Sequence, residues 1–366
     1  MNILDETNFE KLNYETQLDV KNKYLSTLYD NKVLFPITSS PKNINYRHKV
    51  VLSATTINNK LKLGLYEEGS KNVKPTLNNN LHDADINEIY KTIEQILNKY
   101  KLSAYDIDKN VGIIKHILIR KSFVYKTFLI VIVTNGSLLP NAKNICKDIV
   151  SSNYKIETII QNIQNKKTHL VLLENEKILY GCGYIYDEIN GIKYRLSSQS
   201  FYQVNPIQMI NLYNKVIELG EINKNSVVLD CYSGIGTITL LASRNARAVI
   251  GVEVNKSSHM DAVFNKKLNK IDNAIFVNED VEKYIVNLEK IDVLIMDPTR
   301  EGASKAFLDA VLKMMPKKII YVSCEPITQV RDFKTLLNKY DLKCVHPFDM
   351  FPNTCHVECV ALLERK

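Results

Sequence analysis

One cysteine stands at a place in the chain where a nucleophile would be useful. Cys324 follows the apolar stretch KKIIYVS, which predicts a buried strand, and it precedes Glu325 and Pro326. Ligands of open α/β sheets gather at the carboxyl ends of the strands. A cysteine after a buried strand is more often a small core residue than a nucleophile. The residues expected near Cys324 must therefore decide between the two roles.

Two charged residues, a carboxylate and a guanidinium, are expected at the same edge as Cys324. Asp297 and Arg300 end the preceding apolar strand in the segment DPTR. His356 and Glu358 lie in HVECV near the end of the chain, where strand alternation puts both side chains on one face. A thiol beside a carboxylate suits covalent catalysis, in which a thiolate attacks and a carboxylate removes a proton. The alternative is that Glu358 is only a structural strand residue.

A glycine turn predicts a binding site for a nucleoside cofactor. In DCYSGIGT, Gly234 and Gly236 let the backbone turn tightly and approach a ligand. Glu253 closes the next strand, where a carboxylate can accept hydrogen bonds from ribose hydroxyls. NAD would use the same arrangement, but Thr239 stands where its third glycine would fall. The acidic Asp230 suits a sulfonium cation better than a pyrophosphate. A purely structural turn is the alternative.

The elements that must position these residues divide the chain into three predicted parts. Strands and helices alternate over residues 196–366, which predicts a doubly wound parallel sheet of the α/β class. Residues 42–195 contain short β-branched strands around the helical stretch ADINEIYKTIEQILNKYKL and predict an α+β domain. Residues 1–41 predict a helical segment followed by a loop bounded by Pro36 and Pro41.

Composition narrows the class of protein. The 366 residues are 45% apolar and carry a formal net charge of +8, which permits sizeable cores and suits a polyanionic partner. There is no secretion signal and no apolar run of membrane-spanning length, so we expect a cytoplasmic, monomeric protein without a membrane partner. Cys355 and Cys359 would lie about 13 Å apart in a strand and could not share one ion. No metal site is expected.

In these segments the chain resembles the RNA uracil-5-methyltransferase family. The resemblance covers about 160 residues and rests on the motifs SFYQVN (200–205), DCYSGIG (230–236), Glu253, DPTR (297–300), YVSCEP (321–326) and FPNTCHVE (351–358). It implies a class I methyltransferase sheet with a preceding RNA-binding domain, S-adenosylmethionine as cofactor and RNA as substrate. It further implies that Cys324 attacks C6 of a uracil and that Glu358 removes the C5 proton. The implied cofactor contacts are Gln203, Tyr232, Gly234, Glu253 and Asp297.

The sequence also departs from the family pattern. Residues 1–40 are too short for the N-terminal β-barrel module of many relatives, and no cysteine precedes Cys146, so we expect no iron–sulfur cluster. Thr299 replaces the usual second proline, and Glu325 stands where asparagine or aspartate is common. The forms SFYQVN and DMFPNTCHVE favour ribosomal RNA over transfer RNA as the substrate.

Two other functions compete with this interpretation. A methyltransferase acting on an exocyclic amine would share the cofactor loop but would need no thiol, so Cys324 and Glu358 discriminate against it. A non-catalytic RNA-binding protein would not need to retain both reactive residues. For RNA capture, the sequence predicts a basic face on the α+β domain formed by Arg47, His48, Lys49, Lys115, His116, Arg120 and Lys121.

Overall fold

The computed structural model describes residues 9–366 except 10, 68, 77, 167, 169, 287 and 289. The chain forms two compact units. Unit 1 contains the described residues up to Asn43, together with residues 189–194 and 200–366. Unit 2 contains residues 44–188 and 195–199. The N-terminal segment therefore belongs to the same unit as the C-terminal half of the chain.

Unit 1 is built on a seven-stranded sheet with the order β12-β11-β10-β13-β14-β16-β15. Adjacent strands are parallel, except that β16 runs antiparallel to both β14 and β15. The predicted α/β class is confirmed, with one reversed strand that the alternation of elements did not indicate. The strands are β10 (Val227–Cys231), β11 (Ala248–Val252), β12 (Ala274–Val277), β13 (Val293–Met296), β14 (Lys318–Ser323), β15 (Tyr340–Phe348) and β16 (Glu358–Arg365).

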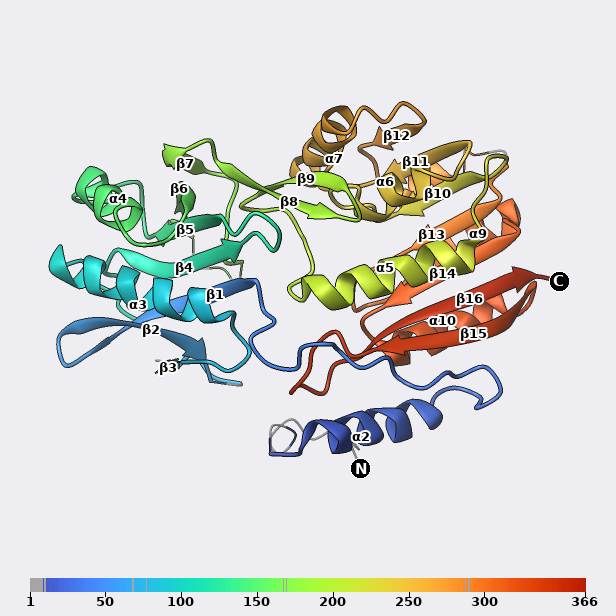
Figure 1. The fold of residues 1–366 in the computed structure, drawn as a ribbon, viewed down its shortest axis with the longest axis horizontal. Coiled ribbons are helices and arrows are strands. Elements are labelled where there is room, and N and C mark those ends of the chain that lie inside the picture. The colour runs from blue at the N-terminus through green and yellow to red at the C-terminus, as the bar shows by residue number, and fades with distance from the viewer. Residues whose placement is uncertain are drawn as a thin grey trace. The chain divides into compact units, whose positions relative to one another are not determined.

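Helices cover both faces of this sheet, as expected for crossover connections between parallel strands. α5 (Pro206–Gly220), α6 (Thr237–Ser243) and α7 (Lys256–Leu268) pack against it, and α5 crosses β14 and β16. α8 (Val281–Ile285), α9 (Lys305–Met314) and α10 (Pro326–Leu336) share a separate apolar core with the strands. Figure 1 shows α5 in front of the sheet and α10 behind β16. The sheet thus lies between two layers of helices, which hold the ends of its strands in place.

The N-terminal segment joins the core shared by α8, α9 and α10. Its helix α2 (Tyr14–Ser26) is capped by the Asn13 side chain, which accepts a hydrogen bond from the Thr16 backbone N–H. Leu25 and Tyr29 are buried in this core. Beyond the helix, Leu34 forms a parallel bridge with Val345 of β15. The segment therefore continues along the edge strand of the sheet.

Unit 2 has a second seven-stranded sheet, in the order β3-β2-β1-β4-β5-β6-β7. Helices α3 (Ala84–Lys99) and α4 (Ala142–Val150) pack on each other and on this sheet, and they share one apolar core with it. The hairpin strands β8 (Tyr184–Ile189) and β9 (Ile192–Ser197) form a separate two-stranded sheet, of which residues 189–194 belong to unit 1. The other strands are β1 (Lys49–Ile57), β2 (Lys60–Tyr66), β3 (Val73–Pro75), β4 (Ile114–Lys121), β5 (Phe128–Thr134), β6 (Ile156–Ile163) and β7 (Glu176–Gly181). In the part of the chain that the structure describes, no helix has the length and apolarity to cross a membrane.

The predicted basic face of this unit is largely turned inward, which corrects the sequence-based expectation. Arg120 is 2% exposed and donates a hydrogen bond to the Ser197 carbonyl. The ammonium of Lys121 lies 2.6 Å from carboxylate oxygens of both Asp83 and Asp85. These cations are paired inside the unit because the strands that carry them are buried on both faces.

Candidate active site

The antiparallel pairing of β14 and β16 brings the predicted nucleophile and base together. The last pair of their register is Ser323 with Cys359. One position beyond this pair lie Cys324, just past the end of β14, and Glu358, the first residue of β16. Directly opposite residues of an antiparallel pair lie about 4.5–5.5 Å apart at Cα. The thiol and the carboxyl group therefore belong to one small site, although 34 positions separate them in the sequence.

Three carboxyl groups meet at this edge with little to neutralise them. Burial raises the pKa of Glu358 to about 8, and the nearby Asp297 charge adds to the shift. Removal from solvent raises the pKa of Asp297, at the end of β13, to about 7. Burial likewise raises the pKa of Asp230, in β10, to about 7, although Thr239 Oγ1 lies 2.5 Å from its Oδ2. The site concentrates buried carboxyl groups whose ionised form a bound cation would stabilise.

The protonation of Cys324 reflects the same surroundings. Burial, followed by the charges of Glu358 and Asp297, raises the pKa of the Cys324 thiol to about 11, while Arg300 opposes the shift. Arg300 also lowers the pKa of Glu358, and its Nη2 lies 3.4 Å from His356 Nε2. Arg300 is thus the cation of this edge that favours a thiolate. The family motifs assigned it no role, although DPTR had placed it on the same rim.

The glycine turn has the geometry of a ligand-binding loop. Tyr232, Gly234 and Gly236 have φ values of +64°, +55° and +84°, in the left-handed region that only glycine adopts readily. A β-carbon added to Gly236 would lie 2.5 Å from Phe276, so the close packing there requires glycine. A left-handed Tyr232 is unusual, and such residues cluster at binding sites.

Glu253 is tied directly to this loop. Its Oε2 accepts the Gly234 N–H at 2.9 Å, and its Oε1 accepts the Asn255 N–H at 2.6 Å. Each carboxylate oxygen has a second lone pair that is available to a ligand hydroxyl. These two contacts explain why an acidic residue at this spacing belongs to the site. The Glu253 carboxylate holds the glycine loop and the residues that follow β11 in place.

A pocket of about 30 Å³ lies between the loop and the carboxylates, and the polar groups that line it suit a cationic nucleoside. The Ser233 hydroxyl is buried without a hydrogen-bond partner among the described residues. A β-carbon added to Gly234 would meet no atom within 4 Å, so the backbone there borders open space. A polar group and a donor-rich loop therefore face a cavity with acidic walls. The lining residues are Phe201, Tyr213, Asp230, Tyr232, Ser233, Gly234, Ile235, Thr237, Ile238 and Asp297.

Most of the predicted cofactor residues lie at the pocket, but one does not. Tyr232, Gly234 and Asp297 line the pocket, and Glu253 reaches it through its bond to Gly234. Gln203 is buried, with 7% of its surface exposed, and does not line this pocket, whereas Phe201 of the same motif does. Ser233 was missed by the sequence reasoning, although it lies inside DCYSGIG; its unsatisfied hydroxyl is visible only in the structure.

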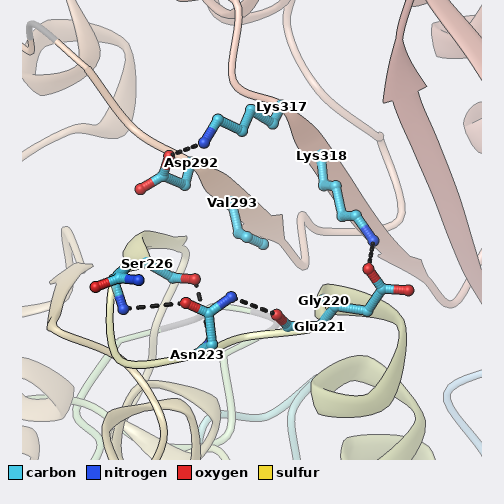
Figure 2. Close-up of a pocket in the computed structure, with 9 residues that line it drawn as sticks. Gly220, Glu221, Asn223, Ser226, Asp292, Val293, Lys317 and Lys318 are labelled. Atoms are coloured by element: carbon cyan, nitrogen blue, oxygen red, sulfur yellow. Dashed lines mark hydrogen bonds and ion pairs between the residues drawn. The ribbon is translucent and has the colours of Figure 1, made fainter.

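A second cavity of about 330 Å³ lies at the opposite, amino ends of the strands (Figure 2). There Lys317 pairs with Asp292 at 2.9 Å, and Lys318 pairs with Glu221 at 2.7 Å. The Asp292 carboxylate also accepts the Val227 N–H at 2.9 Å. Because these charges neutralise one another, the cavity lacks the unbalanced groups of the carboxyl edge.

The fold and the pocket together define a class I S-adenosylmethionine-dependent methyltransferase. The chain belongs to the tRNA (uracil-5-)-methyltransferase family, whose model matches residues 13–366. This confirms the resemblance seen in the motifs, and the protein is an S-adenosylmethionine-dependent RNA methyltransferase.

Individual relatives agree with this assignment. The chain is 34% identical to an uncharacterized RNA methyltransferase of Oceanobacillus iheyensis, over 98% of this chain and 80% of that one. It is 33% identical to an uncharacterized RNA methyltransferase of Staphylococcus aureus, over 98% and 81%. Among solved structures, it is similar to the Pyrococcus abyssi tRNA (uracil-54, C5)-methyltransferase in complex with S-adenosyl-L-homocysteine. That match has a TM-score of 0.83 and 25% identity, and it covers 99% of this chain and 86% of that chain.

Proposed function

We propose that the enzyme methylates C5 of a uridine in RNA through a covalent bond between Cys324 Sγ and C6 of the uracil. The observation that carries the proposal is that Cys324 and Glu358 are the next residues beyond Ser323 and Cys359, the last pair of the β14–β16 register. A methyltransferase acting on an exocyclic amine would use neither group. A non-catalytic RNA-binding protein would have no use for a buried carboxyl group opposite a thiol.

The reaction needs one nucleophile and one base. The Cys324 thiolate adds to C6, which makes C5 a carbon nucleophile. S-adenosylmethionine supplies the methyl group from a positively charged sulfonium. C5 then carries both the new methyl group and its original hydrogen. The Glu358 carboxylate removes that hydrogen as a proton, and the electron pair re-forms the C5–C6 double bond as Sγ leaves.

The raised pKa values suit these two tasks in different ways. A carboxyl group whose pKa is about 8 is a stronger base than an exposed glutamate, which favours removal of a carbon-bound proton. The Cys324 thiol is mostly protonated near neutral pH, because its pKa is about 11 while the acidic neighbours are uncompensated. A positive charge in the pocket, or Arg300 beside the thiol, lowers the cost of the thiolate.

For the cofactor, we propose that Glu253 accepts the ribose hydroxyls and that the Gly234 loop and the Ser233 hydroxyl contact the nucleoside. Asp297 and Tyr232 would line the sulfonium end, since both border the pocket. Gln203 is retained as a proposed contact from the family motif alone.

The test of covalent catalysis is Cys324→Ala, with Cys182→Ala as the control because Cys182 is exposed in unit 2. Cys324→Ala should abolish formation of 5-methyluridine and leave S-adenosylmethionine binding intact. It should also lose the denaturation-resistant adduct with RNA containing 5-fluorouridine, in which fluorine replaces the departing proton. Normal turnover by Cys324→Ala would refute the proposal, while Cys182→Ala should behave like the wild type.

Two RNAs are candidate substrates. The motif forms SFYQVN and DMFPNTCHVE favour ribosomal RNA, and we propose it first. The family description and the Pyrococcus abyssi enzyme named above favour tRNA as the second candidate. Mapping 5-methyluridine in ribosomal and transfer RNA from a deletion strain decides between them, since the modification disappears only from the true substrate.

A further inference from the structure

The loop of residues 349–357 leads directly into Glu358, the proposed base. It connects β15 to β16, and the last pair of their antiparallel register is Phe348 with Glu358. The loop thus starts after Phe348, which lies opposite Glu358, and it ends at Glu358 itself. A shift of the loop would move the first residue of β16, which is Glu358 itself.

A buried ion pair fastens this loop to the N-terminal helix. Lys21 of α2 places its Nζ 2.6 Å from Asp349 Oδ1, and both side chains are 0% exposed. The same ammonium lies 3.4 Å from the Phe351 carbonyl oxygen. Burial lowers the pKa of Lys21, while the Asp349 charge opposes that shift. The pair therefore links residue 21 to two positions in the loop.

Stability alone does not account for this pair. Buried charges lose their hydration, and replacing a buried ion pair with matched uncharged groups is often neutral or stabilising. Here the second oxygen of Asp349, Oδ2, is buried without a hydrogen-bond partner in the described part of the chain. A half-satisfied buried carboxylate is a costly way to hold a fold together, which favours a role for the pair in fixing the geometry of the loop.

Neighbouring contacts act on the same loop. Gln17 lies one helical turn before Lys21, and its Nε2 donates to Asn353 Oδ1 at 2.8 Å. The Asn353 N–H donates back to Gln17 Oε1 at 3.0 Å. The Asp349 N–H donates to the Thr38 carbonyl at 2.9 Å. Residues of the N-terminal segment thus hold the loop near its start and its middle.

We propose that Lys21 is a positioning residue for the methyl-transfer reaction: through Asp349 it fixes the loop that sets Glu358 opposite Cys324. This inference rests on the proposed roles of those two residues. It makes the N-terminal helix part of the catalytic apparatus, although no residue of α2 need touch substrate or cofactor.

The decisive variant is the double substitution Lys21→Met with Asp349→Asn, because it removes both charges and leaves neither one buried alone. The single Lys21→Met leaves Asp349 unpaired and is expected to unfold at a lower temperature. The double variant should recover most of that loss and should bind S-adenosylmethionine normally. Its kcat for release of 5-methyluridine should nevertheless fall roughly ten- to a hundredfold, the effect of a small misplacement of a catalytic group. Labelled protein–RNA adduct should accumulate on denaturing gels.

The matched control is Lys318→Met, which also removes a largely buried lysine but at the opposite edge of the same sheet (Figure 2). It should change thermal stability and leave the adduct fraction unchanged. A double variant that releases product at the wild-type rate overturns the positioning role, as does one that loses stability without accumulating adduct. Glu358→Gln, assayed in parallel, separates the two proposals: if it traps adduct and the double variant does not, only the role of Lys21 fails.

Discussion

In the unit 1 sheet, the amino ends of the strands (the amino edge) and their carboxyl ends (the carboxyl edge) both carry charged residues, but these residues are paired differently. At the amino edge, Lys317 and Lys318 neutralise Asp292 and Glu221, so each charge has a partner (Figure 2). At the carboxyl edge, burial raises the pKa of Asp230, Asp297 and Glu358. The Asp297 charge adds to the shifts of the other two, and Arg300 opposes the shift of Glu358.

This difference indicates which edge carries the chemistry. Paired charges at strand ends can stabilise a fold, and they require nothing from a ligand. Buried carboxyl groups without matching cations are unfavourable until something positive arrives or a proton binds. Both edges offer a cavity, so the presence of a cavity does not distinguish them. The balance of charge does.

The strongest test of the comparison is Glu358→Gln, which keeps the shape of the side chain and removes its basicity. Attack by the thiol and methyl transfer need no base at C5, so both steps should proceed and the third should stall. Loss of a general base typically slows a step by about 10²–10⁴-fold. Denaturing gels with a labelled methyl donor should show slow-migrating protein that carries label. Release of 5-methyluridine at the normal rate would remove Glu358 from the mechanism.

A second test separates the ribose end of the pocket from its acidic end. Glu253→Ala removes a charged acceptor, and hydrogen bonds to charged groups contribute about 1.5–3 kcal/mol. Affinity for S-adenosylmethionine should therefore fall roughly ten- to over a hundredfold. S-adenosylhomocysteine has the same ribose, so its affinity should fall equally. Unchanged binding in calorimetry would contradict the assignment, and thermal melting monitors the Gly234 and Asn255 contacts that are also lost.

The acidic end should instead respond to pH and to the charge of the ligand. Carboxyl groups with pKa values of about 7 to 8 are neutral at pH 5 and ionised at pH 9. Affinity for the cationic S-adenosylmethionine, relative to neutral S-adenosylhomocysteine, should rise with pH by about tenfold, equivalent to about 1.4 kcal/mol. The ligand-free protein should lose stability over the same window, because its folded state holds protons that the unfolded state releases near pH 4. Asp297→Asn should flatten both trends. A pH-independent affinity ratio would show that the carboxyl groups do not sense the sulfonium.

How much of this could be predicted from the sequence depends on the range of the contacts involved. The Gly234 loop and Glu253 were predictable, because a strand, a turn and the next strand end form a local unit. The pairing of Cys324 with Glu358 was expected from the family motifs alone. Its geometry depends on the reversed direction of β16, which strand–helix alternation does not encode.

Residues whose partners lie far away in the sequence were the ones that sequence reasoning misjudged or missed. Arg120 and Lys121 looked like a basic surface, since nothing local shows that Asp83, Asp85 and Ser197 receive them. Lys21 was assigned no role from the sequence, because its partner Asp349 lies 328 positions away. Charge in a sequence is therefore a poor guide to exposed charge, because strands from distant segments decide which side chains are covered.

The smallest predicted effect belongs to the amino edge and completes the comparison. Lys317 is 61% exposed and pairs with Asp292 at 2.9 Å. An exposed ion pair of this kind contributes about 0–1 kcal/mol, and salt screens it. Lys317→Met should thus lower the free energy of unfolding by less than about 1 kcal/mol, and less still at high salt. Product release, cofactor affinity and the pH trend should match the wild type, because none of the carboxyl-edge groups is changed. Denaturant unfolding at two salt concentrations, with a turnover assay on the same samples, measures both quantities. If Lys317→Met altered the ratio of S-adenosylmethionine to S-adenosylhomocysteine affinity, the two edges would be electrostatically coupled and their division into a structural and a chemical edge would be wrong.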